Sequence, residues 1–436
     1  MWDVNLSDWE NDSVSSRFGE EGWQERYVAF VKQITSKPVV GVGRFTSPDT
    51  MVSQIRRGVL DMIGAARPSI ADPFLPEKIE QGRLDEIREC IGCNICISGQ
   101  HTFTPMRCTQ NPSVGEEWRR GWHPEWIAPK GSDATVLVIG AGPAGLEATR
   151  ALGQRGYAVT LAEAGGKPGG RVTQESRLPG LSAWARARDW RVGRIQEMAN
   201  VEVFLDSHLS TEDILEYGFD HVVVATGARW RADGVGVSNW QPIRGSDQTH
   251  VLTPEHIYAG ATIADPVLVF DDDNFYLGAL VAEKLQDEGH AVTLVTTVSK
   301  VSSWTENTLE QHRIQARVLE RGIEVVTAHT IVQIHTDQVD CACVYTNRLR
   351  TLPAGSVVMV TSRRPDNQLY LALMENPEKL TSAGIRSVSA IGDCNNPSSI
   401  ATAIYEGHRV ARELDAAPVD PDMPFRREQV ALASSV

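Results

Sequence analysis

The feature that most constrains the fold is a short apolar strand that runs directly into a glycine-rich turn. Residues 136–145 read Val-Leu-Val-Ile-Gly-Ala-Gly-Pro-Ala-Gly, and the pattern continues as a helix through Leu152. In a G-x-G-x-x-G turn, Gly140 makes the tight turn, Gly142 lets a pyrophosphate approach the backbone, and Gly145 lets helix and strand pack closely. The helix N-terminus also offers free N–H groups to the phosphates. The sequence therefore predicts an α/β domain that binds an adenine dinucleotide or adenine nucleotide; the alternative is a glycine turn used for packing alone.

Further positions fit such a domain. A second strand, residues 158–161, ends near Glu163, about 20 residues beyond the turn, where a carboxylate can accept the ribose hydroxyl groups. Another strand closes on the small-residue turn Thr226-Gly227. Near the C-terminus, Gly392-Asp393 stands between a strand and a helix, where the aspartate is expected to meet the ribityl or pyrophosphate region of a nucleotide. The alternative for Asp393 is an ordinary turn or helix-capping residue.

Four of the seven cysteines are grouped as Cys90-x2-Cys93-x2-Cys96-x11-Cys108. This spacing is typical of a [4Fe–4S] cluster, because three closely spaced thiolates can bind three corners of the cube while the fourth arrives from a distant turn. Structural zinc, the alternative, more often uses two separated pairs of ligands. Disulfides are disfavoured because the N-terminus shows no export signal. A cluster of this kind transfers single electrons, which predicts a redox partner, usually a flavin.

A second α/β segment differs at the position of the glycine turn. Residues 267–270 and 291–296 are predicted strands, with a helix over 277–288 between them. The turn reads Phe270-Asp-Asp-Asp273, where carboxylates and nearby aromatic residues would repel or block a pyrophosphate. We therefore expect a Rossmann-like domain that does not bind NAD(P)H.

The remaining segments complete an α/β organisation. Residues 38–43 and 61–67 are predicted strands with an amphipathic helix over 51–60 between them, which indicates a parallel unit. The region that carries the four cysteines is predicted to be loop-like, and residues 387–414 are predicted to form a strand, a Gly-Asp turn and a helix. The expected domains are 1–85, 86–130, 131–232 together with 380–415, 233–379, and a loosely held tail at 416–436.

Composition excludes several classes of function. A chain of 436 residues is too long for one core, so several domains are expected. The net charge of −14 argues against a nucleic-acid partner or an acidic membrane surface. The sequence contains no apolar run of about 18 residues, and residues 1–10 do not resemble a signal peptide. We therefore expect a cytoplasmic protein.

Four longer motifs carry a family resemblance. They read Gly-Val-Gly-Arg-Phe-Thr at 41–46, Ile-Gly-Ala-Ala-Arg-Pro-Ser-Ile-Ala-Asp-Pro-Phe at 63–74, Cys-Ile-Gly-Cys-Asn-Ile-Cys-Ile-Ser at 90–98 and Arg-Arg-Gly-Trp-His-Pro-Glu at 119–125. Over nearly the whole chain they resemble the trimethylamine, dimethylamine and histamine dehydrogenases, Old Yellow Enzyme-like iron–sulfur flavoproteins related to 2,4-dienoyl-CoA reductase. The resemblance implies the C-terminal part of a (β/α)8 TIM barrel with FMN, then a [4Fe–4S] loop, then two Rossmann-like nucleotide-binding domains.

The resemblance also implies an activity. In this family, oxidation of a small amine reduces FMN, and electrons pass through the cluster to an electron-transferring flavoprotein. The cluster ligands carry over to Cys90, Cys93, Cys96 and Cys108. The site around the glycine turn and Glu163 holds ADP in the dehydrogenases and FAD in the related reductase. The acidic turn of the second domain favours the dehydrogenase branch, which uses no NADPH.

Two glycine–arginine pairs are candidates for the FMN phosphate. Gly43 and Arg44 follow the first predicted strand, and Gly64 and Arg67 follow the second. Loops after the last two strands of a TIM barrel commonly bind phosphate, and backbone N–H groups with a guanidinium suit that ligand. Arg67 can instead form a surface ion pair.

The resemblance further implies two catalytic residues. Trp9 resembles a tryptophan of the aromatic bowl that holds alkylammonium groups by cation–π attraction. Asp12 resembles the aspartate that partners an active-site histidine. The alternatives are a core tryptophan and a helix-capping aspartate.

The N-terminal region departs from the family. Only about 85 residues precede the cysteines, whereas a TIM barrel takes about 250. We therefore expect the chain to lack most of the barrel, to bind FMN only if the barrel is completed, and to be incomplete for catalysis alone. A separate N-terminal barrel polypeptide or a truncated gene would account for this, and a homodimer is compatible with the sequence. Two alternatives are an NADPH-dependent 2,4-dienoyl-CoA or enoate reductase relative and a non-catalytic electron-transfer subunit of a split enzyme.

Overall fold

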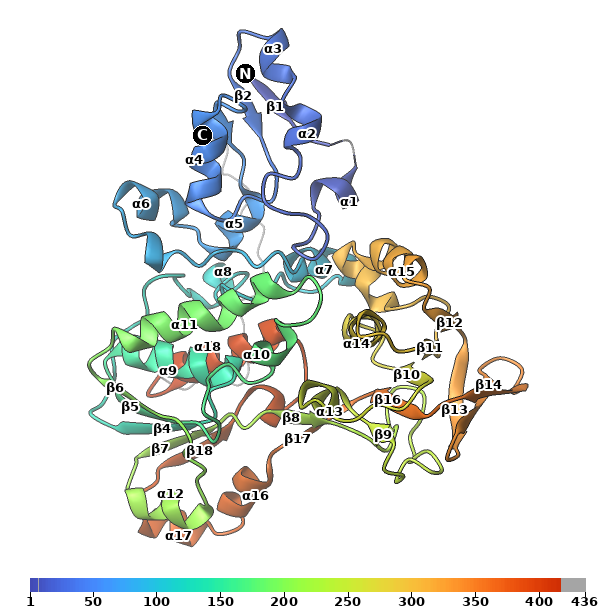
Figure 1. The fold of residues 1–436 in the computed structure, drawn as a ribbon. Helices are drawn as coiled ribbons and strands as arrows, with labels where there is room; N and C mark the ends of the chain where they lie inside the picture. The colour runs from blue at the N-terminus through green and yellow to red at the C-terminus, as the bar shows by residue number, and fades with distance from the viewer. Residues whose placement is uncertain (7, 417–436) are drawn as a thin grey trace, which may run out of the picture.

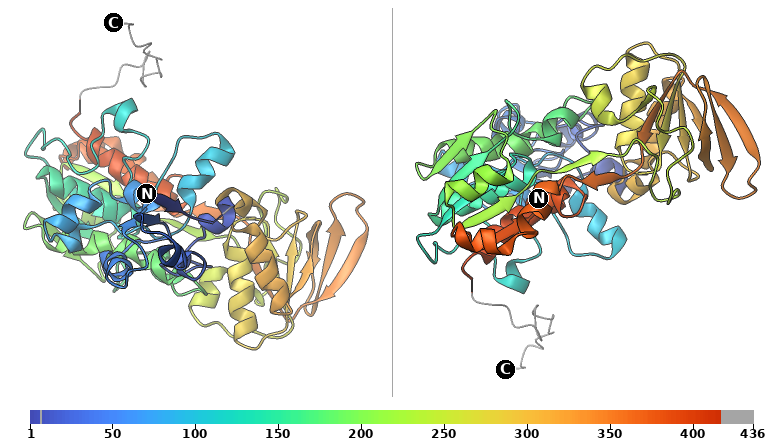
Figure 2. Two further views of the ribbon diagram at one scale, coloured as in Figure 1. Left: turned by 90° about the horizontal axis from the view of Figure 1, so that it is seen from above. Right: turned by 90° about the horizontal axis from the view of Figure 1, so that it is seen from below.

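The computed structural model describes residues 1–6 and 8–416. The N-terminal unit, blue in Figure 1, lies on one side of the cysteine segment, and a first large α/β unit, green and red, lies on the other. Figure 2 shows the second large α/β unit, yellow to orange, extending to one side of both. Within the described residues, no helix is both long enough and apolar enough to cross a membrane. Nearly all of the tail expected at 416–436 lies outside the described residues.

The N-terminal unit is built on a three-stranded parallel sheet in the order β1-β2-β3. Helix α4 begins after Ser47, whose Oγ accepts the N–H of Thr50, and Pro48 fixes the backbone of its first turn. This helix connects β2 to β3 and covers the sheet, as the sequence predicts. The elements are β1 Trp2–Val4, α1 Trp9–Asp12, α2 Glu25–Val28, α3 Val31–Ile34, β2 Val39–Gly41, α4 Pro48–Arg56 and β3 Met62–Ile63.

The strand predicted over 61–67 is wrong beyond Ile63. The N–H of Gly64 still donates to the carbonyl of Gly41 at 2.8 Å, but helix α5 begins two residues later and contains Arg67. Pro68 lies in the first turn of that helix, where its missing N–H is not needed. The helix predicted over 51–60 likewise lies earlier, at Pro48–Arg56.

The cysteine segment is more helical than the predicted loop. Asn94 adopts a left-handed conformation, with φ of 56°, and α7 begins directly after it. The Asn94 amide donates to the carbonyl of Ser13 at 2.7 Å and to that of Thr308 at 3.0 Å, so this turn is held by two distant parts of the chain. The elements from the end of the N-terminal unit onward are α5 Ala66–Ala71, α6 Leu75–Glu80, the 3₁₀ helix η1 Leu84–Glu86, α7 Ile95–Thr102 and α8 Glu117–Arg120.

The first large α/β unit contains a five-stranded parallel sheet in the order β18-β7-β4-β5-β6. Helices α9, α11 and α18 cover one face, and α12, α16 and α17 lie at the other, as Figure 1 shows. Helix α18 packs so closely on α9 that a Cβ at Gly407 would lie 2.1 Å from the carbonyl oxygen of Ala144. The elements are β4 Thr135–Ile139, α9 Pro143–Arg155, β5 Ala158–Ala162, α10 Arg171–Glu175, η2 Ser182–Ala185, α11 Arg186–Gln196, β6 Val201–Phe204, α12 Thr211–Tyr217, β7 His221–Val224, α16 Gln368–Met374, α17 Pro377–Ser382, β18 Ser387–Ala390, η4 Gly392–Cys394 and α18 Ile400–Glu413.

The second large α/β unit contains a parallel sheet in the order β12-β11-β10-β16-β9 and an antiparallel sheet, β13-β14-β15, that the sequence did not predict. Strand β15 is mostly exposed, so it lacks the apolar alternation that marks a half-buried strand. The short pair β8, Ala228–Trp230, and β17, Arg363–Pro365, joins the two large units. The elements are β9 Val251–Leu252, α13 Pro254–Tyr258, β10 Val267–Asp271, α14 Leu277–Asp287, β11 Val292–Thr296, η3 Ser303–Thr308, α15 Gln311–Glu320, β12 Glu324–Val326, β13 His329–Ile334, β14 Gln338–Cys343, β15 Leu349–Pro353 and β16 Ser356–Val360.

Candidate functional site

The turn between β4 and α9 has a geometry that suits phosphate binding. Gly140 has φ of 102°, and a Cβ there would lie 2.5 Å from the carbonyl oxygen of Ala225. A Cβ on Gly145 would lie 1.9 Å from the carbonyl oxygen of Gly140, so only glycine allows α9 to approach the turn this closely. A Cβ on Gly142 would meet no atom within 4 Å. The turn is therefore closed by two of its glycines and open to a cavity at the third.

Glu163 stands beside this turn at the end of β5. Its Oε2 accepts the N–H of Ala141 at 2.7 Å, and its Oε1 accepts the N–H of Gly165 at 2.8 Å. Each carboxylate oxygen has a further lone pair, so Glu163 can still accept a hydrogen bond from a ribose hydroxyl group. The predicted position of this acid relative to the glycine turn fits a ribose contact.

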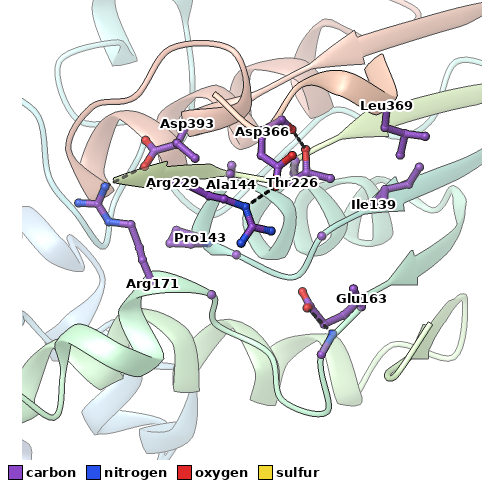
Figure 3. A pocket seen from close by; sticks show the side chains of 18 of the residues that line it. Ile139, Pro143, Ala144, Glu163, Arg171, Thr226, Arg229, Asp366, Leu369 and Asp393 are labelled. Atoms are coloured by element: carbon purple, nitrogen blue, oxygen red, sulfur yellow. Dashed lines mark hydrogen bonds and ion pairs between the residues drawn. The ribbon is translucent and has the colours of Figure 1, made fainter. Parts of the chain in front are cut away.

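A cavity of about 1120 Å³ extends from the glycine turn. In Figure 3, Glu163 lies near one end of this cavity, and Asp393 with Arg171 lies at the other. Gly227, with φ of 82°, contributes its backbone to the wall. The volume lies slightly above the roughly 300–1,000 Å³ that is typical of small-molecule sites, so the cavity has room for a nucleotide. Further wall residues are Pro143, Ala144, Thr226, Arg229, Asp366 and Leu369.

Two arginines that the sequence analysis missed bind Asp393. Its Oδ2 accepts hydrogen bonds from Arg171 at 2.8 Å and from Arg363, and its Oδ1 accepts the N–H of Ser398 at 2.9 Å. Burial raises the pKa of Asp393, and the charge of Arg171 opposes this rise. Gly392 has φ of 63°, and a Cβ added to it would lie 2.6 Å from the Cβ of Ala144. Only glycine therefore lets the chain pass Ala144 this closely. This end of the cavity thus offers guanidinium groups as well as the predicted carboxylate.

The four clustered cysteines lie in one neighbourhood. Each of Cys93, Cys96 and Cys108 has its pKa raised, first by burial and also by the charges of other cysteines in the group. The pKa of Cys96 rises to about 12 and that of Cys108 to about 11. Within the described part of the chain, no group of three or more His, Cys, Asp or Glu side chains is arranged to hold a metal ion. The [4Fe–4S] site therefore stays a prediction.

Backbone N–H groups and arginines surround these thiols. Gly92 donates to the sulfur of Cys90 and Gln110 to that of Cys108, both at 3.4 Å. The charge of Arg67 opposes the burial-driven rise in the pKa of Cys96, and the charge of Arg88 opposes the rise in that of Cys108. Positive charges of this kind favour thiolates, which are the form that binds iron.

The predicted phosphate residues of the N-terminal unit differ in how they are engaged. Arg44 has φ of 57°, and its Nε and Nη1 are buried without a hydrogen-bond partner among the described residues. Arg67 is already bonded: its Nη1 donates to the carbonyl of Val14 at 3.0 Å and to the side chain of Asn94. Arg67 therefore links the N-terminal unit to the cysteine turn. Within the described part of the chain it forms no ion pair, so the alternative of a surface ion pair is not supported. Gly43 and Gly64 follow β2 and β3.

The two predicted catalytic residues lie on α1. Trp9 is 44% exposed and stacks on His101, with ring centroids 5.4 Å apart. Asp12 accepts a hydrogen bond from the side chain of Gln24 at 2.9 Å. Their proposed catalytic roles stay predictions.

The acidic turn after β10 is filled by its own side chains. Asp271 and Asp272 are fully buried. Oδ1 of Asp271 accepts the N–H of Asn274 at 2.9 Å, and burial raises the pKa of Asp271 well above its usual value. A Cβ on Gly278 would lie 2.4 Å from the Asp271 carboxyl carbon, so the carboxyl group occupies the space at the start of α14. This geometry fits the expectation that the second unit does not hold a pyrophosphate.

Three family descriptions match successive parts of the chain. Residues 1–86 match the NADH:flavin oxidoreductase / NADH oxidase family, and residues 134–265 match the pyridine nucleotide-disulphide oxidoreductase family. Residues 252–367 match the Old Yellow Enzyme-like second alpha/beta domain. Together with the glycine turn and its cavity, these matches place the chain among proteins built from domains of flavin-dependent oxidoreductase families, with an α/β nucleotide-binding domain.

Individual relatives narrow the class. The chain is 40% identical to dimethylamine dehydrogenase of Hyphomicrobium sp. (strain x), over 99% of this chain and 62% of that protein. The structure of histamine dehydrogenase from Rhizobium sp. 4-9 superposes with a TM-score of 0.96 at 50% identity, over 99% of this chain and 63% of that one. A 6-hydroxypseudooxynicotine amine oxidase from Pseudomonas geniculata N1 superposes with a TM-score of 0.92 at 51% identity, over 95% of this chain and 62% of that one. Over nearly its whole length, the chain is thus similar to part of the dimethylamine and histamine dehydrogenases.

These comparisons correct one expectation. The prediction that the chain lacks most of the N-terminal barrel is not upheld, because residues 1–86 match the flavin oxidoreductase family and the alignment covers 99% of the chain. The chain spans about three fifths of the length of these relatives, 62% and 63% for the two dehydrogenases.

Proposed function

We propose that the protein is an iron–sulfur flavoprotein that oxidises the CH–NH group of a small amine and passes the electrons through a [4Fe–4S] cluster to an electron-transferring flavoprotein. The observation that carries the proposal is the link between the flavin-family segment and the cysteine turn. Arg67 bonds the backbone at Val14 and the side chain of Asn94, which stands between Cys93 and Cys96. Electron transfer from a flavin to a cluster requires such close packing of the two parts.

The cluster would be held by Cys90, Cys93, Cys96 and Cys108. A bound [4Fe–4S] cluster supplies one-electron transfer. The chain itself must release the protons of the buried thiols when iron binds, and the nearby charges of Arg67 and Arg88 favour that release. The N–H groups of Gly92 and Gln110 point at two of the sulfurs and would stabilise their negative charge.

FMN fits the N-terminal unit at its glycine–arginine pairs. The buried Nε and Nη1 of Arg44 have no hydrogen-bond partner among residues 1–6 and 8–416, which is costly unless a ligand supplies an acceptor. A phosphate is the acceptor that a guanidinium fork suits best. Gly43 lies two residues beyond β2, beside Arg44, and Gly64 lies directly beyond β3, although the N–H of Gly64 already donates to the carbonyl of Gly41. Nη1 of Arg67 is already bonded to Val14 and Asn94, so Arg67 would mainly orient the cysteine turn towards this site. Only its other N–H groups would be free to contact the phosphate.

The large cavity would hold the adenosine diphosphate part of ADP or FAD. The phosphates would lie at Gly140, Gly142 and the N-terminus of α9, with Glu163 on the ribose. Asp393, Arg171 and Arg363 would meet the far end of the ligand. Nucleotide released by denaturation distinguishes the two, because FAD adds flavin absorbance to an adenine spectrum.

The cluster assignment is tested by anaerobic purification with iron and sulfide analysis. We expect about four irons per chain. The Cys93→Ser variant should lose the cluster, whereas Cys341→Ser, which changes a buried cysteine of β14 outside the segment, should retain it. Equal iron content in both variants would contradict the assignment.

The activity is tested by amine-dependent reduction of ferricenium with dimethylamine, trimethylamine and histamine as substrates. Reduction by at least one amine, with no change in NADPH absorbance at about 340 nm, is the expected result. If NADPH were oxidised and no amine reacted, the related enoate reductase function would replace the one proposed here.

A further inference from the structure

A second cavity lies on the other side of the Arg171 and Arg363 side chains. Its volume is about 500 Å³. Its wall combines α7 of the cysteine segment, through Ser98 and Thr102, with the acidic turn of the second large unit, through Asp273. The cavity therefore forms where the cysteine segment meets the second unit, away from the glycine turn.

Aromatic rings form much of this wall. Phe275 contacts Tyr276 and Trp304, with ring centroids 4.5 Å and 4.6 Å apart and both pairs edge to face. The backbone N–H of Trp304 donates to the carbonyl of Asn274 at 2.9 Å, which holds the start of η3 against the acidic turn. Trp230 completes the wall and carries Arg363 over its ring at 5.5 Å. Such rings present negative faces that attract cations.

The charges in the wall do not balance. Arg171 pairs with Asp393 and with Glu175, and Arg363 pairs with Asp393. Arg107 pairs with Glu116, at 2.8 Å, and lies over the ring of Tyr405. The carboxylate of Asp273 accepts the N–H of Phe275 but forms no ion pair with a described residue. One carboxylate in an aromatic cavity thus has no ion-pair partner among the described residues, and the guanidinium charge that acts on it, that of Arg171, is shared with Glu175 and Asp393.

We propose that this cavity binds a small organic ammonium ion, with Asp273 as its counter-ion and the rings of Trp304 and Phe275 against its methyl groups. Cation–π attraction and a carboxylate together favour an alkylammonium over a neutral molecule of the same shape. The cavity shares Arg171 and Arg363 with the proposed nucleotide cavity but does not include the glycine turn or the predicted FMN residues. Its occupation by an ammonium ion therefore does not depend on the catalytic function proposed above.

The raised pKa of Asp273 is consistent with a buried carboxyl group that a bound cation would help to ionise. Burial raises the pKa of Asp273 to about 6, so ionising this carboxyl group costs more free energy here than in water. Arg171 opposes this rise, but its guanidinium is already committed to two other carboxylates. A bound ammonium ion would stabilise the ionised form.

The test is isothermal titration of the purified protein with choline and with its neutral isostere 3,3-dimethyl-1-butanol. We expect saturable binding of choline and none of the alcohol. Asp273→Asn and Trp304→Ala should each weaken choline binding about tenfold or more, while Trp304→Phe keeps an aromatic face and should largely restore it. Trp240→Ala removes a tryptophan that is 84% exposed and absent from this wall, and should leave binding unchanged.

Two results would overturn the proposal. The first is equal binding of choline and the alcohol, since that would show a merely apolar cavity. The second is binding that survives Asp273→Asn but is lost in Trp9→Ala, because the cation would then lie at the predicted catalytic bowl. Melting temperatures of the variants separate lost binding from lost folding.

Discussion

The two large α/β units share a strand–turn–helix layout but differ in what fills the turn. After β4, the glycine turn leaves a cavity of about 1120 Å³ that reaches Gly142. After β10, the carboxyl group of Asp271 occupies the turn and accepts the N–H of Asn274. In the first unit, the absence of a side chain on Gly145 leaves room for the backbone of the turn. In the second unit, the absence of a side chain on Gly278 leaves room for the Asp271 carboxyl group.

Whether such a unit can bind a phosphate depends on what occupies the turn between strand and helix, and not on the strand–turn–helix layout that both units share. A helix N-terminus carries partial positive charge and free N–H groups in both units. In the first unit these groups face a cavity that an external anion can enter. In the second unit an internal carboxyl group has taken that place, and burial keeps its pKa raised.

The largest effect is expected for Gly145→Ala. The new Cβ would lie 1.9 Å from the carbonyl oxygen of Gly140, so α9 must move away from the turn. We expect a loss of about 3 kcal/mol in stability and no bound nucleotide. Thermal unfolding and nucleotide release measure the two. A variant as stable as the parent would show that this close approach is not required.

Asp273→Asn is expected to stabilise the second unit in a pH-dependent way. Burial is the first cause that raises the folded-state pKa of Asp273, to about 6. Its stabilising contribution is therefore full below pH ~4 and lost as the pH rises through about 6. Above that value the variant should be more stable than the parent by about 2 kcal/mol. Melting curves between pH ~5 and ~8 check this, and a difference that does not change with pH would contradict the assignment.

Gly142→Ala and Gly278→Ala form a matched pair for the two turns. The first adds a methyl group to open space, so stability should hold while nucleotide affinity falls about tenfold. The second adds a methyl group 2.4 Å from the Asp271 carboxyl carbon, so stability should fall by about 1 kcal/mol while nucleotide content holds. Titration with ADP and thermal unfolding distinguish them. If Gly142→Ala lowered only stability and Gly278→Ala lowered only nucleotide binding, the assignment of the nucleotide site to the first unit would be wrong.

The smallest effect is expected for Arg229→Ala. This side chain is 79% exposed and pairs with Asp366 at 3.1 Å on the cavity wall. An exposed pair contributes little, so nucleotide affinity should fall only about threefold. A loss of about a hundredfold in ADP titrations would mean that Arg229 binds a phosphate directly.

The sequence anticipated what depends on local spacing. The close packing at Gly140 and Gly145 and the open position of Gly142 follow from a fixed pattern of backbone turns, and the position of Glu163 follows from the length of one helix and strand. The binding of a nucleotide by these residues stays a prediction. The partners of Asp393 could not be predicted, because Arg171 and Arg363 come from segments far apart in the chain.

Other features escaped prediction for similar reasons. The contact between Arg67 and Asn94 depends on how the N-terminal unit packs on the cysteine segment. Helix α7 was missed because its cysteines and small residues show no apolar periodicity, and the exposed antiparallel sheet of the second unit shows little alternation. The roles of Trp9 and Asp12 depend on neighbours that the residue types alone do not specify.

The most direct test of the account is a count of adenine nucleotide per chain in the purified protein. Denaturation followed by chromatography measures this number. The account predicts one, bound at the glycine turn, and none in the second unit. A protein that releases two adenine nucleotides per chain, or that binds none even when ADP is supplied in excess, would contradict it.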